Sequence, residues 1–180
     1  MTASSAIPAD STAIIDSSVL FAMGGPDNEK YRAFQRFVTR QRITVTVPRR
    51  VAEELGESPA AYAYQRDRLR AAQEAGWLEP GSIDFSVPGV SEVVDRTRAR
   101  MAKRSAEDVT EDEIEKTDTI LAGLAYQYAI DEATHVTVFV SDTLAEGAIR
   151  DVLSSTTVGE RMLVVEGRLF INDLVDSSIR

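Results

Sequence analysis

AIIDSSVL, residues 13–20, is a short apolar run that ends in a carboxylate and continues with small hydroxyl residues. Three apolar residues in a row, two of them β-branched, predict a strand that is buried on both faces in the middle of a parallel sheet. Because ligands of open α/β sheets bind beyond the carboxyl ends of the strands, we expect Asp16 at the functional site. In the alternative interpretation, Asp16 or Ser17 only caps a short helix that begins near Ser18.

Strand-like and helix-like segments alternate along the rest of the chain. Residues 43–47 and 136–140 are rich in β-branched residues and predict two further strands. Helices are predicted where apolar residues recur at helical spacing or where helix start and stop signals occur. These segments are residues 31–38, 51–55, 59–75, 90–104, 117–131 and 143–153. This alternation predicts an α/β fold, a three-layer α/β/α domain with a largely parallel central sheet.

Several segments are less regular. Residues 1–12 predict a flexible N-terminal tail ahead of a single domain over 13–180, which is an ordinary size for one domain. Residues 77–85 are predicted to form a turn or a small strand pair, and residues 162–171 a hairpin or two short strands. The acidic stretch 105–115 is predicted to be a solvated connection. We find no signal peptide and no apolar run long enough to span a membrane, so we expect a cytoplasmic protein without membrane contact.

The composition excludes several kinds of site. The chain has no cysteine and one histidine, which excludes disulfides, thiolate nucleophiles, Cys-based zinc sites and His-rich metal sites. Its net charge is −9, from 29 acidic and 20 basic residues, only three of which are lysines. That balance is typical of proteins from salt-accumulating microbes, such as halophilic archaea. A net acidic surface also disfavours non-specific nucleic-acid binding at low salt, although it permits a local basic site.

Carboxylates occupy positions where the pattern favours apolar residues. Asp118 completes the apolar stripe of the helix predicted over 117–131, and a charged group on such a stripe is costly unless it has a partner. Glu54 similarly continues the face that Val47 and Val51 begin. In the alternative interpretation, Asp118 sits in a first helical turn, where the helix dipole favours an acid, and Glu54 lies on the surface.

A fourth acid, Asp142, follows the strand predicted over 136–140. Thr143 and Glu146 have capping-box spacing, so Thr143 is expected to cap the next helix and to leave Asp142 without that role. Four carboxylates in one cleft would repel one another unless a cation lay between them. Oxygen donors without His or Cys suit Mg²⁺ or Mn²⁺, so we expect one pocket to contain all four acids and one of these ions.

In this order and spacing, the segments around the four acids resemble those of PIN-domain nucleases over residues 13–153. The segments that carry the resemblance are IIDSSVL (14–20), VPRRVAEEL (47–55), DTILA (118–122) and VFVSD (138–142). The resemblance implies a divalent-metal-dependent endoribonuclease in which Asp16, Glu54, Asp118 and Asp142 are the catalytic metal carboxylates and Ser18 supports the first of them. It also implies RNA as substrate and a homodimer.

Other functions remain open within this family. The chain is longer than the compact toxin members, and the extra length lies within residues 57–104. A toxin would need an antitoxin partner, and a ribosome-maturation member would need its own partner, although the cysteine-based zinc ribbon of some such proteins is missing. A catalytically silent PIN fold that binds RNA or protein is the remaining alternative.

The helix predicted over residues 90–104 is unusually basic. Its inner stripe is Val90, Val94, Thr97 and Met101, which leaves Arg96, Arg100 and Lys103 or Arg104 along an outer line. We predict that Arg96, Arg100 and Arg104 contact RNA. The alternative is a solvated face on which Glu92 pairs with Arg96, Asp95 with Arg98, Lys103 with Glu107 and Arg104 with Asp108, so that only Arg100 is left over.

Overall fold

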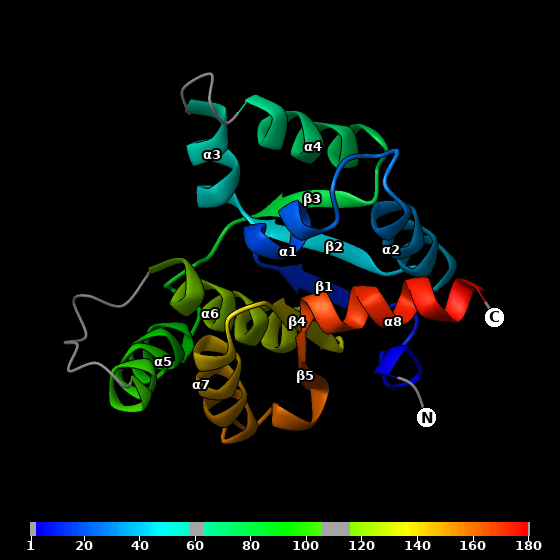
Figure 1. Ribbon diagram of the computed structural model, residues 1–180. Coiled ribbons are helices and arrows are strands. Elements are labelled where there is room, and N and C mark those ends of the chain that lie inside the picture. The colour runs from blue at the N-terminus through cyan, green and yellow to red at the C-terminus, as the bar shows by residue number, and fades with distance from the viewer. Residues whose placement is uncertain (1–2, 58–62, 106–115, 180) are drawn as a thin grey trace.

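The protein folds as a five-stranded sheet in which every strand is parallel to its neighbours (Figure 1). This computed structural model describes residues 3–57, 63–105 and 116–179, without the side chains of residues 3, 54–57, 63–65 and 116. The strand order is β3-β2-β1-β4-β5. The strands are β1 (Thr12–Ile15), β2 (Thr44–Pro48), β3 (Leu78–Gly81), β4 (Val136–Val140) and β5 (Met162–Glu166).

Helices cover both faces of the sheet and complete the expected three layers (Figure 1). On one face lie α1 (Ser17–Ala22), α2 (Glu29–Arg40), α3 (Arg49–Glu57), α4 (Ala63–Glu74) and α8 (Gly167–Ile179). On the other lie α5 (Val90–Arg104), α6 (Lys116–Asp131) and α7 (Thr143–Ser154). Two 3₁₀ turns, η1 (Ala3–Ala6) and η4 (Gly159–Arg161), complete the described elements. The predicted three-layer fold is confirmed.

The central strands are buried on both sides, as their apolar runs predict. Every residue of β1 and β4 is buried, and Ile15 pairs with Phe139 across the two strands. Ile15 packs toward α1, α2 and α8, whereas its neighbour Ile14 packs toward α6 and α7. Successive strand residues point to opposite faces, so a strand covered on both faces needs apolar residues at each position.

Two segments differ from the expectation. Residues 162–171 do not form a hairpin: β5 ends at Glu166 and the helix α8 begins at Gly167. This apolar run is too short for its period to distinguish a strand from a helix. The helical conformation buries Phe170 and Ile171 against the sheet. Residues 77–85 contain one edge strand, β3, parallel to β2, and no strand pair.

The N-terminal segment packs against the domain, where the sequence predicted a flexible tail over residues 1–12. Ala3–Ala6 form a 3₁₀ turn, and Ile7 is buried in the core beneath α8. The Ile7 side chain therefore contacts the domain, and the flexibility of residues 1–12 stays a prediction. The predicted solvated connection falls largely on residues 106–115, outside the described residues. Within the described ranges, no helix is long and apolar enough to cross a membrane.

Candidate active site at the carboxyl edge of the sheet

A cavity of about 470 Å³ opens at the carboxyl ends of β1 and β4. Three of the four predicted acids line it, one following each of these two strands and one in the first turn of α6. The lining residues are Asp16, Ser17, Ser18, Asp118, Ser141, Asp142, Thr143 and Arg168. Asp16 precedes Asp118 by 102 residues and Asp142 by 126 residues in the sequence, and the fold brings all three to one cavity.

Asp16 is both a helix cap and a cavity residue. Its carboxylate accepts a hydrogen bond from the backbone N–H of Ser18 at 3.4 Å, which caps α1 as the alternative interpretation proposed. The Ser18 hydroxyl donates to the second carboxylate oxygen of Asp16 at 2.7 Å and also lies 2.7 Å from the hydroxyl of Ser141. Ser18 therefore fixes the orientation of Asp16, the supporting position that the family resemblance implies for it.

Asp142 caps α7, and the prediction that Thr143 does so is wrong. Asp142 Oδ1 accepts hydrogen bonds from the backbone N–H groups of Leu144, at 2.7 Å, and Ala145, at 3.3 Å. Thr143 is instead the first residue of the helix. Aspartate and threonine compete for the same orphan N–H groups, and aspartate is the better cap. Both bonds end on Oδ1, and no hydrogen bond from a described residue reaches the other carboxylate oxygen, Oδ2.

Asp118 is the buried member of the group. It lies in the first turn of α6 and keeps only 7% of its surface exposed, so the stripe position that its spacing predicted is confirmed. The fourth acid, Glu54, belongs to α3, which starts directly after β2, but its side chain lies outside the described residues. The structure therefore brings together Asp16, Asp118 and Asp142 and leaves the position of the Glu54 carboxylate a prediction.

The cavity provides oxygen donors of the kind that Mg²⁺ and Mn²⁺ prefer. Among the described side chains, no three acids are close enough to form a ready-made metal cage. Mg²⁺ usually keeps several waters and uses one or two carboxylates, so an open cavity lined by separated acids fits it better than a closed cage does. The donor set is therefore compatible with such an ion through water-bridged contacts.

Helix N-termini contribute to the electrostatics of the cavity. The helices α1, α6, α7 and α8 all begin at or beside it, since each has a lining residue at its cap or in its first turn. The partial positive charge of a helix N-terminus stabilises nearby carboxylates and also attracts anions such as phosphate. This edge of the sheet therefore favours negatively charged groups, both the carboxylates of the protein and a phosphate.

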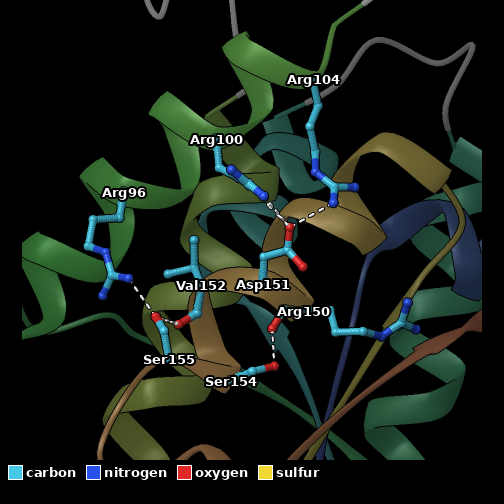
Figure 2. A network of polar contacts seen from close by, with 8 residues as sticks. All are labelled: Arg96, Arg100, Arg104, Arg150, Asp151, Val152, Ser154 and Ser155. Carbon is cyan, nitrogen blue, oxygen red and sulfur yellow. Dashed lines mark hydrogen bonds and ion pairs between the residues drawn. The ribbon is translucent and has the colours of Figure 1, made fainter.

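The three arginines predicted to contact RNA are exposed, and each bonds to a residue of α7 or of its C-terminal cap (Figure 2). Arg100 and Arg104 both form ion pairs with Asp151, at 2.9 and 2.7 Å, and Arg96 donates to the Ser155 hydroxyl at 2.5 Å. The hydrogen bond from Arg100, together with the charge of Arg104, lowers the pKa of Asp151.

This network corrects part of the predicted pairing on α5. Arg100 was expected to be left over, yet it binds Asp151, a partner from another helix that spacing within α5 cannot reveal. The pair of Asp95 with Arg98 is confirmed at 3.4 Å. The expected partners Glu107 and Asp108 lie outside the described residues. Val90, Val94, Thr97 and Met101 are buried, so the predicted inner stripe of α5 is confirmed.

Four cavity residues were absent from the predicted site: Ser17, Ser141, Thr143 and Arg168. Ser17 and Thr143 are sequence neighbours of the predicted acids Asp16 and Asp142. Ser141 follows β4 directly, so the rule that selected Asp142 could also have selected it. Arg168 had no such signal, because the sequence predicted strand structure where α8 begins. Only the helix places this arginine at the cavity.

Comparison with known proteins agrees with this arrangement. No curated protein and no solved structure matches the chain. A family model described as the Halobacterial PIN domain matches residues 9–179, which is nearly the whole sequence and includes all four predicted acids. This match confirms the resemblance seen in the four acidic segments, and the chain belongs to the Halobacterial PIN domain family.

Proposed function

We propose that this protein is a divalent-metal-dependent endoribonuclease whose site consists of Asp16, Glu54, Asp118 and Asp142. One observation carries the proposal: three acids from separate parts of the chain, one of them 7% exposed, line a single cavity at the carboxyl edge of the sheet. PIN domains are generally nucleases, and the family match extends over the whole of this edge. Mg²⁺ and Mn²⁺ are the ions that this donor set favours.

The chain's own residues position the reaction. Ser18 holds the Asp16 carboxylate through its hydroxyl, and the α7 backbone fixes Asp142 through Oδ1. A bound divalent ion would supply a water of lowered pKa and offset negative charge on the phosphoryl oxygens. No covalent nucleophile is required, in keeping with a chain that has no cysteine. Asp118 lines the cavity with 7% of its surface exposed and would be the most buried of the oxygen donors there.

Removal of divalent ions tests this proposal. The purified protein should cleave RNA with Mg²⁺ or Mn²⁺, lose that activity in EDTA and recover it when the ion is returned in excess. Gel analysis of a panel of labelled RNAs measures cleavage, and calorimetric titration measures Mn²⁺ binding. Cleavage that persists in EDTA would contradict the metal requirement. Mn²⁺ binding without cleavage of any RNA would favour the silent binding module instead.

We also retain RNA contact by α5 as a proposal, and the network with α7 sharpens its test. Replacement of Arg96, Arg100 and Arg104 by Gln should weaken RNA binding across sequences and leave Mn²⁺ affinity unchanged, because the cavity does not include them. Asp151→Asn is the matched control, since it breaks the same ion pairs but keeps all three arginines. RNA affinity is measured by fluorescence anisotropy. If the parent, the control and the triple variant bind RNA equally well, the three arginines only connect α5 to α7 and do not contact RNA.

A further inference from the structure

Arg168 lines two neighbouring cavities. It faces the acidic cavity together with Asp16, Asp118 and Asp142, and it also lines a smaller cavity of about 110 Å³ with Ala22, Lys30, Ile171 and Asn172. Its side chain is exposed and forms no ion pair with any described carboxylate, although three of them share its cavity. An arginine beside acids that it does not neutralise remains available to a ligand.

Packing around the preceding residue fixes where Arg168 stands. Gly167 is buried against α1, and a Cβ there would lie 2.7 Å from a methyl carbon of Val19. Only glycine lets the Val19 side chain approach the α8 backbone this closely. Phe170 and Ile171, at 2% and 1% exposure, anchor the same turn in the core. The first turn of α8 is therefore rigid, and it presents Arg168 at the rim of the acidic cavity.

Lys30 extends the positive charge away from the acids. It lies in the first turn of α2, is exposed, and shares the smaller cavity with the Asn172 amide. The chain has only three lysines, and the side chain of this one forms no ion pair with the described residues. Two cavities therefore meet at Arg168: one contains the carboxylates, and the other contains Lys30 and the Asn172 side chain.

We propose that Arg168 and Lys30 form a phosphate track for single-stranded RNA, an inference that rests on the proposed nuclease function. Arg168 binds the phosphate next to the carboxylates through its planar guanidinium, which suits bidentate contact with phosphate oxygens. Lys30, with Asn172, binds a neighbouring phosphate of the same strand. At molar salt the screening length is about 3 Å, so only direct contacts of this kind keep their strength.

The test uses the Asp142→Asn background, in which bound RNA is not consumed, and compares Arg168→Gln and Lys30→Gln. Affinity for a short single-stranded RNA, measured by anisotropy with Mn²⁺, should fall roughly tenfold for Arg168→Gln and less for Lys30→Gln. The slope of log affinity against log salt should decrease by about 0.7 for each contact removed. Arg168→Lys should recover part of the affinity, since it restores the charge but not the planar pair of donors.

Arg40→Gln is the matched control, because it removes one exposed positive charge from the last turn of α2, at the other end from Lys30. If Arg168→Gln and Lys30→Gln bind RNA as Arg40→Gln does, or if the parent binds no single-stranded RNA, the track is overturned. The proposed nuclease function fails on a separate result, absence of cleavage by the unmodified protein with Mg²⁺ or Mn²⁺. RNA binding lost in the two variants without any cleavage in the parent would support the track alone.

Discussion

Asp142→Asn is expected to lower the rate of RNA cleavage at least about 100-fold. Changing a residue that only supports a metal ligand costs up to about 100-fold, and the loss of a ligand itself should cost at least as much. The substitution removes a charged oxygen donor from the cavity. It should leave the fold intact, because asparagine caps helices as well as aspartate and can accept the same hydrogen bonds from Leu144 and Ala145. Cleavage rate and thermal melting, measured on the same preparation, check both halves of the prediction.

Two further variants separate chemistry from stability. Asp142→Ala removes the cap as well and should destabilise the protein by about 1 kcal/mol, with no greater loss of cleavage than Asp142→Asn. Asp10→Asn makes the same chemical change at the opposite edge of the sheet, before β1, where Arg42 lowers the pKa of the Asp10 carboxyl by hydrogen bonding. It should cleave RNA at the parental rate. Full activity in Asp142→Asn would remove Asp142 from the site.

The melting temperature is expected to rise steeply with KCl. A net charge of −9 makes the compact state repel itself, and salt screens that repulsion. Surface ion pairs such as Arg100 with Asp151 weaken in salt, but exposed pairs contribute too little to reverse the trend. We expect the free energy of unfolding to increase by about 3 kcal/mol from low to molar salt, which corresponds to a rise in melting temperature of roughly 6–12 °C for a chain of this length. Calorimetry or circular dichroism across a KCl series measures it.

Charge reversal on α8 provides the control for salt. Asp173 and Asp176 are exposed, and Asp176 lies in the last helical turn, which has no basic residue and where the dipole disfavours an acid. Asp173→Lys with Asp176→Lys should raise the melting temperature at low salt and flatten its dependence on KCl. A melting temperature that is constant from low to molar KCl in the parent would show that acidic self-repulsion does not govern its stability.

The amino-acid sequence alone was sufficient where a pattern has its own local cause. The run of apolar residues in β1 and β4 predicts strands buried on both faces, and the acid that ends each run is thereby assigned to the carboxyl edge. The apolar stripe of α5 and the buried position of Asp118 follow from helical spacing in the same way. Each of these predictions depends on residues that are neighbours in the chain.

Tertiary structure decided what depends on partners distant in sequence. Spacing within α5 could not show that Arg100 binds Asp151, 51 residues further along the chain. The stretch from Met162 to Ile171 is too short to distinguish strand from helix by its period, and packing of Phe170 and Ile171 on the sheet makes its second half helical. The sequence by itself determined the central strands and the acids that follow β1 and β4, because burial imposes its pattern residue by residue. Only the packed fold placed Arg168 beside those acids, because the close contact of Gly167 with Val19 exists only once α8 lies on α1.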